Sequence, residues 1–299
     1  MKFFGAFSQY KALSDEQKAF ISNAQKKFVK TPDELVKFFK PMAVFDKTCD
    51  EARAQLLNYV ILFGVLSFLG IFAAIVALAE DYLIVIPIEL LMVLLTFVGI
   101  IIRWRLGKID IHNNLREFVV PVVNLIGQDM EAGTKISLDL DLRGKTLDSK
   151  LKDNRKNDPG WFSYPKVTTR VYDDPWFRLT GQLVDGSRLI LNVDDQVTRI
   201  DKTYKGSSGK IKSKTKYKIK HEIMAGLALK HKKYAVAGEN ELTGLGDGLK
   251  YKDGDNRQLI CLKDKIKTYD VDANVDPQRC LALLGKIFMS VQLAAEKGS

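Results

Sequence analysis

Two apolar runs constrain this sequence more than any other feature. Residues 56–79 carry no charged side chain, and residues 83–102 carry only Glu89. At about 1.5 Å per helical residue, each run can cross the roughly 30 Å hydrocarbon core of a bilayer. Helices buried in a soluble core rarely extend so far without a polar face. The runs therefore predict a two-helix transmembrane hairpin over residues 56–102.

Basic residues flank these runs on one side only. The short connection between the runs holds Glu80 and Asp81, whereas lysine and arginine lie before the first run and after the second: Lys37, Lys40, Lys47, Arg53, Arg103, Arg105, Lys108 and Arg116. The positive-inside rule places both termini in the cytoplasm. We expect an integral protein of a bacterial inner (plasma) membrane.

The segments on either side of the hairpin read as helices. Residues 1–55 form a cytoplasmic N-terminal part, in which SDEQ at 14–17 and TPDE at 31–34 are capping-box patterns. The first opens a helix expected to extend through Phe28, and the second opens one expected to end near Pro41. Residues 103–130 predict a juxtamembrane helix with a kink at Pro121.

Residues 131–299 predict a cytoplasmic β-rich domain with a C-terminal helix. Residues 135–143 alternate apolar and polar side chains, 144–160 read as a surface loop, and Asp185-Gly186 marks a hairpin turn. Further strands follow from Val197, through 209–223 and over 257–269, before a helix capped at Asp276. The expected fold is thus an α+β membrane protein whose β domain is mostly antiparallel, as a sandwich or barrel. The order of its elements resembles a pleckstrin-homology-like split barrel.

A row of lysines dominates the stretch GKIKSKTKYKIKHEI at 209–223. If this stretch is a strand, alternate side chains share one face, about 6.6 Å apart. Ile211, Tyr217 and Ile219 then fall together on the opposite, buried face. We call the six residues on the first face the lysine row: Lys210, Lys212, Lys214, Lys216, Lys218 and Lys220.

The lysine row has a structural and a functional interpretation. It is either a solvated edge, balanced by an acidic strand such as the one holding Asp139 and Asp141, or a binding surface. Residues 131–299 hold 32 Lys and Arg against 23 Asp and Glu, so anionic lipid headgroups or an acidic protein are the expected partners. Nucleic acid is disfavoured, because the row lacks interleaved aromatic residues and arginine forks.

The apolar runs contain two further candidate features. Glu89 is an intramembrane carboxylate, and such groups often mark a transport path, although Pro87 can also place it in a first helical turn near the headgroups. Small residues on one side of the first run would allow another helix to approach closely: Ser67, Gly70, Ala74 and Ala77. The approaching helix is the second run or another subunit, so we also expect a homo-oligomer or a membrane complex.

No catalytic or metal-ligating pattern is evident. Cys49, Cys261 and Cys280 are odd in number and far apart, as expected of reduced structural thiols. His112, His221 and His231 lie on different elements, and no serine, cysteine or carboxylate is placed with them as a triad or metal cluster. The glycine-rich stretch 238–256 lacks phosphate-loop spacing. We therefore expect no enzyme and no cofactor. The leading hypothesis is a membrane-anchored, non-enzymatic scaffold or sensor, and the alternative is a subunit of an oligomeric channel or transporter with Glu89 in its path.

Overall fold

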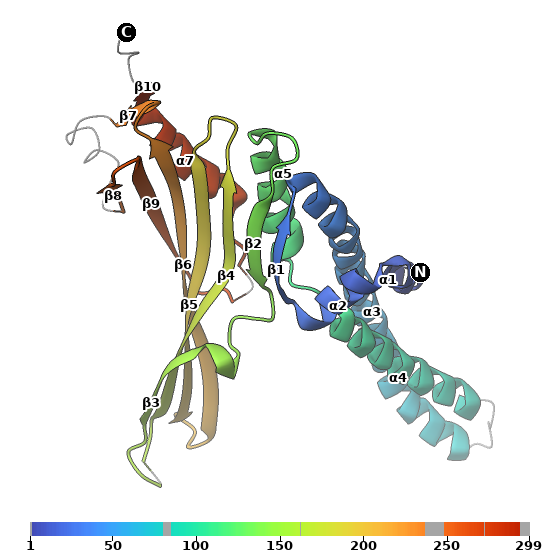
Figure 1. The fold of residues 1–299 in the computed structure, drawn as a ribbon. Helices are drawn as coiled ribbons and strands as arrows, with labels where there is room; N and C mark the ends of the chain where they lie inside the picture. Colours follow the sequence, from blue (N-terminus) through green and yellow to red (C-terminus); the bar gives the residue numbers. More distant parts are fainter. Residues whose placement is uncertain (1, 80–84, 162, 237–247, 272, 294–299) are drawn as a thin grey trace, which may run out of the picture. The chain divides into compact units, whose positions relative to one another are not determined.

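The structure is a computed structural model that describes residues 2–79, 85–161, 163–236, 248–271 and 273–293 (Figure 1). The chain divides into two compact units. The helical unit comprises residues 1–22 and 38–112, and the β-rich unit comprises residues 23–37 and 113–299. Each unit is considered by itself below.

Long helices make up the helical unit. Its elements are α1 (Lys2–Ala12), α2 (Asp15–Asn23), most of α3 (Pro32–Ala79) and α4 (Val85–Ile109). Both predicted capping boxes are confirmed: Ser14 Oγ accepts a hydrogen bond from the Gln17 amide at 3.2 Å, and Thr31 Oγ1 accepts one from the Glu34 amide at 3.3 Å. The prediction that the second helix ends near Pro41 is wrong. Proline removes one backbone donor, and α3 continues through it to Ala79.

α3 and α4 are long and apolar enough to cross a membrane. In the most apolar stretch of each helix, only 6% of the residues of α3 and 0% of those of α4 are buried within the described structure. Large apolar side chains such as Phe68 and Leu90 are instead more than half exposed. The apolar stretches of these helices are therefore exposed in the part of the chain described, whereas the first half of α3 contributes buried residues such as Phe39 and Phe45.

The two helices run antiparallel. Gly99 lies against Val60, Gly64 against Thr96, and Gly70 against Glu89, so residue numbers rise along one helix as they fall along the other. Beyond the apolar runs, Arg103 donates a hydrogen bond to the Arg53 carbonyl at 2.7 Å.

The β-rich unit is built on one open antiparallel sheet. Its strand order is β1-β2-β4-β5-β6-β9-β8, with β3 paired to β4 beside β2, and β7 pairs separately with β10. The strands are β1 (Gln25–Lys30), β2 (Ile136–Asp141), β3 (Leu151–Asn157), β4 (Lys166–Gln182), β5 (Arg188–Lys205), β6 (Ile211–Lys230), β7 (Tyr234–Val236), β8 (Lys250–Asp253), β9 (Arg257–Thr268) and β10 (Val291–Leu293). The expected antiparallel sheet is confirmed, but the described strands do not close into a barrel.

Helices pack on one face of this sheet. They are the π-helix η1 (Leu115–Val119), α5 (Val120–Gln128) and α7 (Pro277–Met289), and α7 lies against β6 and β9 (Figure 1). The Asp276 side chain caps α7 by accepting from the Gln278 amide at 2.9 Å, as predicted. The predicted helix over 103–130 is interrupted after Ile109, and Pro121 lies in the first turn of α5, directly after the π-helix.

Two segments differ from the sequence-based expectation because of pairing far along the chain. Residue Ala24, with φ of 50°, ends the predicted N-terminal helix, and Phe28 lies in β1, paired with Leu138 of β2. The expected surface loop over 144–160 contains the short 3-10 helix η2 (Asp148–Lys150) and β3. In both cases the hydrogen bonds come from a partner strand elsewhere in the chain, β2 for β1 and β4 for β3. The local sequence pattern does not indicate that pairing.

Candidate functional site

The lysine row lies on one face of β6 and the residue before it. The predicted strand is confirmed, and five of the six side chains are exposed, with Lys220 half-buried. On the opposite face Ile219 is buried and Tyr217 half-buried, as predicted. Ile211 is 61% exposed, so its predicted burial is wrong. The buried core of the sheet does not extend to the first residues of β6.

The strand register adds further lysines to the same face. Lys202 of β5 pairs directly opposite Lys214, and Lys267 of β9 pairs opposite Lys220. The expected neutralising strand is not the neighbour, because β2, which carries Asp139 and Asp141, pairs with β1 and β4. Within the described residues, no ion pair forms to any member of the lysine row.

The first part of β6 is an edge. β9 pairs with β6 only from Ile219 onward, so the described strands leave Ile211–Lys218 with β5 as the sole neighbour. Lysines on an edge strand discourage sheet-to-sheet aggregation. This arrangement keeps the solvated-edge interpretation alongside that of a binding surface.

Two depressions open on the sheet, one of about 390 Å³ and one of about 380 Å³. The one on the lysine row, here called the lysine hollow, measures about 380 Å³ and is lined by Ile200, Lys202, Tyr204, Lys214, Lys216 and Lys218. The other holds the acidic side chains Asp173, Asp194 and Glu222 as well as basic ones. Positive charge therefore concentrates at the end of β6 that begins the strand.

Glu89 lies within the helix pair. It is the fifth described residue of α4, and its carboxylate occupies the space that a side chain at Gly70 would fill. Ser67 is buried on the same side of α3 and Ala74 is half-buried, while the side chain of Ala77 lies outside the described part. Of these small residues, Gly70 thus contacts α4 of the same chain.

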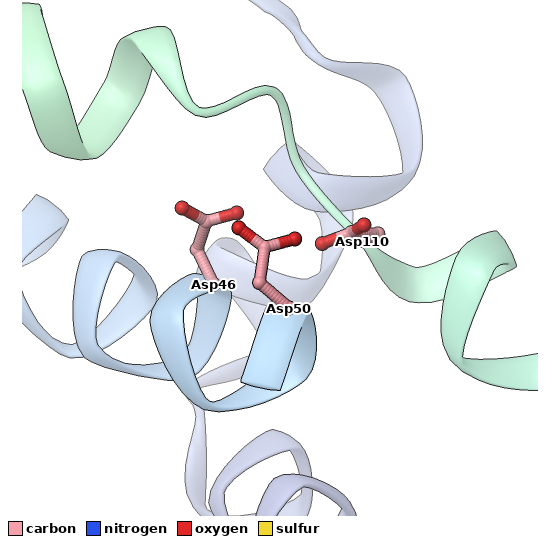
Figure 2. Close-up of side chains that lie close together, drawn as sticks. All are labelled: Asp46, Asp50 and Asp110. Carbon is pink, nitrogen blue, oxygen red and sulfur yellow. The ribbon is translucent and has the colours of Figure 1, made fainter. Parts of the chain in front are cut away.

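A cluster of three carboxylates, which the sequence analysis missed, lies in the helical unit. Figure 2 shows Asp46 and Asp50 on one side of α3 and Asp110 just after α4, with one oxygen of each within 4.8 Å of the others. Their i, i+4 spacing on α3 was visible, but the approach of Asp110 depends on the packing of the two helices. Carboxylates of this kind hold hard divalent cations.

The acidic cluster is already part of a charge network. Arg53 forms an ion pair with Asp110, and Asp46 and Asp50 have interactions of their own. Burial raises the pKa of Asp110, with Arg53 opposing that shift. We therefore interpret the cluster as part of a structural charge network near the ends of the apolar runs.

The β-rich unit contains a second charged arrangement, here called the buried ionic layer. Its residues are Asp141, Lys145, Lys150, Asp174, Asp195 and His221. Lys150 Nζ lies 2.7 Å from Asp174 and 3.2 Å from Asp141, and Lys145 Nζ lies 3.1 Å from Asp195. The two lysines were expected on a surface loop, yet each side chain is only 5% exposed.

His221 also belongs to this layer. Its Nδ1 lies 2.7 Å from Asp195 Oδ1, because β5 and β6 pair these residues directly opposite each other. His231 likewise lies 3.1 Å from Asp253. The sequence analysis paired neither histidine with its carboxylate. A register assignment for the β5–β6 hairpin would have found the first pair.

The carboxylates of the layer respond differently to burial. Burial raises the pKa of Asp174 to about 6, although Lys150 opposes the shift. For Asp195, burial also disfavours the charged form, but the His221 hydrogen bond and the Lys145 charge outweigh it and lower the pKa. Asp195 has two close partners, Lys145 and His221, and Asp174 has Lys150, which accounts for the opposite directions.

The cysteines and the comparisons with known proteins add no catalytic assignment. Cys49, Cys261 and Cys280 are all buried thiols, and burial raises the pKa of Cys280 to about 12. Such thiols are poor nucleophiles, because the thiolate is the reactive form.

No family model, curated protein or solved structure matches the chain.

Proposed function

We propose that this chain is a membrane-anchored, non-enzymatic scaffold or sensor whose β-rich unit binds the anionic surface of the cytoplasmic leaflet. The observation that carries the proposal is the lysine row. Its side chains are regularly spaced, five of the six are exposed, and they form no ion pairs in the described residues, on a chain with two membrane-length helices. Each basic residue near an anionic surface contributes about 1 kcal/mol.

The alternative partners and functions are less well supported. An acidic protein would use the same charges, but the hairpin proposed here tethers the β-rich unit covalently to the membrane, which favours lipid as the partner. For the channel alternative, two helices cannot enclose a water path, and the Glu89 carboxylate packs on Gly70 of its own chain. That contact accounts for Glu89 as a residue that packs between the two helices.

Lipid binding tests the proposal directly. Changing Lys212, Lys214 and Lys216 to Ser should weaken binding to anionic vesicles by about 3 kcal/mol, roughly 100-fold, because three engaged charges are lost. The full chain in neutral phosphatidylcholine nanodiscs is mixed with separate phosphatidylserine vesicles, and co-flotation is measured. Binding should also fall as salt is raised, since exposed charges are screened.

A charge-matched variant separates the row from net charge. Lys156, Lys232 and Lys286 are exposed and lie elsewhere on the β-rich unit, so changing all three to Ser removes the same charge without touching the row. We expect a much smaller loss. If both triple variants bind as the unchanged chain does, the row is a solvated edge, and aggregation of the row variant would mark its protective role.

The orientation of the hairpin is a separate expected result. Cysteine introduced at Asp81 should react with a membrane-impermeant maleimide in spheroplasts, whereas cysteine introduced at Ser208 should react only after permeabilisation. The three native thiols are buried and contribute little background. Protection of position 81 together with reaction at position 208 would reverse the topology and remove the cytoplasmic leaflet as the partner.

A further inference from the structure

The lysine hollow has a defined arrangement of charges around an apolar floor. Ile200 of β5 pairs directly opposite Lys216, and Lys202 pairs opposite Lys214. Lys218 follows on the other side of Lys216 along β6. Directly paired side chains have Cβ atoms about 4.5–5.5 Å apart, and alternate residues of one strand lie about 6.6 Å apart. Four ammonium groups can therefore reach a single bound group above Ile200.

These charges are uncompensated in the described structure. Like charges directly opposite each other on a sheet are destabilising, and among the described residues Lys202, Lys214 and Lys216 form no ion pair. The acidic residues on this face, Asp173, Asp194 and Glu222, line the other depression. Lys202 Nζ lies 5.9 Å from the centre of the Tyr204 ring. A bound multivalent anion would remove the repulsion.

We infer that the lysine hollow binds a phosphate monoester, supplied by a phosphorylated lipid headgroup or by a free phosphorylated small molecule. A monoester carries a charge of about −1.5 to −2 at pH 7 and three strong acceptor oxygens, whereas a phosphodiester or carboxylate carries a single charge. The hollow, at about 380 Å³, falls within the size range of small-molecule sites. Ile200 and the Tyr204 ring provide apolar contact for the carbon part of the ligand.

The lipid form of this inference rests on the proposed binding of the anionic leaflet and sharpens it. Diffuse attraction depends on the total charge of the vesicle, and every lysine of the row contributes alike. A built site instead prefers the monoester over a singly charged headgroup at equal vesicle charge. It also depends on the lysines that line the hollow more than on those at the ends of the row.

Two matched pairs of substitutions test the site. The site pair changes Lys202 and Lys214 to Ser, and the end pair changes Lys210 and Lys220, which do not line the hollow. The full chain in phosphatidylcholine nanodiscs is floated with vesicles of equal charge density containing phosphatidylserine or phosphatidylinositol 4-phosphate. The unchanged chain should bind the monoester vesicles about tenfold more tightly. The site pair should lose this preference, and the end pair should weaken both bindings equally and keep it.

Calorimetric titration of the nanodisc-embedded chain with inositol 1,4-bisphosphate distinguishes the two sources. Binding that the site pair abolishes supports a site open to free small molecules, and no binding with a retained vesicle preference supports a lipid headgroup. Equal binding of both vesicle types without binding of the soluble probe overturns the site and leaves the proposed function standing. Failure to bind either vesicle, with the soluble probe still bound, overturns the membrane function and leaves the site. The variant Lys202→Arg with Lys214→Arg keeps both charges. It should retain binding if the two positive charges, rather than the lysine side chains themselves, hold the ligand.

Discussion

Replacing Lys150 by methionine should lower the free energy of unfolding of the β-rich unit by about 3–5 kcal/mol, because breaking a buried ion pair leaves a charge without compensation. Lys150 Nζ contacts Asp174 at 2.7 Å and Asp141 at 3.2 Å, and it also donates to the Gly144 carbonyl at 3.0 Å. Methionine occupies a similar volume but supplies no charge or donor, so Asp174 loses its close cation in the low-dielectric interior.

Denaturant unfolding of the full chain in detergent, followed by fluorescence, measures this loss. Trp176 is buried in the β-rich unit, and changing Trp104 and Trp161 to Phe makes it the sole reporter. Lys152→Met is the matched control: Lys152 pairs with Asp173 at 2.5 Å, but the two side chains are 61% and 42% exposed. An exposed pair contributes about 0–1 kcal/mol. Equal losses in the two variants would contradict the special role of the buried ionic layer.

The pH dependence provides a second check on the same residue. Burial raises the pKa of Asp174 to about 6 from its ordinary 3.8. A carboxyl group whose pKa is higher in the folded state takes up a proton on folding between these values, so its contribution to stability rises as pH falls through this window. The lowered pKa values of Asp141 and Asp195 act oppositely, since their contribution is lost as pH falls below about 4.

The Lys150→Met loss should therefore be smaller at pH 5 than at pH 7. Without the lysine, Asp174 becomes protonated more readily, and the buried charge disappears. Asp174→Asn should remove the gain in stability between pH 7 and pH 5. A Lys150→Met loss that is the same at both pH values would show that packing, rather than charge, is responsible.

Features set by neighbours along the chain were predictable from the sequence. The capping boxes at Ser14 and Thr31, the cap at Asp276 and the turn at Asp185-Gly186 each depend on residues within a few positions. The lysine row was predictable for the same reason, because alternation along a single strand fixes which side chains share a face. The two apolar runs were predictable from composition and length alone.

Features set by long-range pairing were not predictable in this way. Lysine is usually exposed, so a lysine-rich stretch reads as a surface loop, and only the approach of Asp174 and Asp195 explains why Lys150 and Lys145 are buried. The edge at Ile211 follows from where β9 ends, which no pattern within β6 reveals. The lysine hollow also depends on register, since Lys202 joins the row only through its pairing with Lys214.

Replacing Phe118 by alanine should destabilise the β-rich unit by about 3–5 kcal/mol, the usual cost of removing a buried aromatic ring. Phe118 lies in η1 and is fully buried, with its ring centre 5.1 Å from that of Trp176 and 5.0 Å from that of Phe177. Both contacts are edge-to-face, a geometry that adds to the effect of burial. The substitution leaves a cavity between the π-helix and β4 that rigid strands cannot close.

Denaturant unfolding followed by far-ultraviolet circular dichroism measures this effect without relying on the neighbouring tryptophan. Phe288→Ala is the control, because Phe288 lies on α7 with 44% of its surface exposed, and its loss should be about 1 kcal/mol or less. The π-helical turn places Leu115, Phe118 and Val119 in buried positions. A phenylalanine ring moved by one position along η1 would contact different residues. If Phe118→Ala and Phe288→Ala lower the free energy of unfolding equally, the packing of η1 against the sheet contributes little to stability.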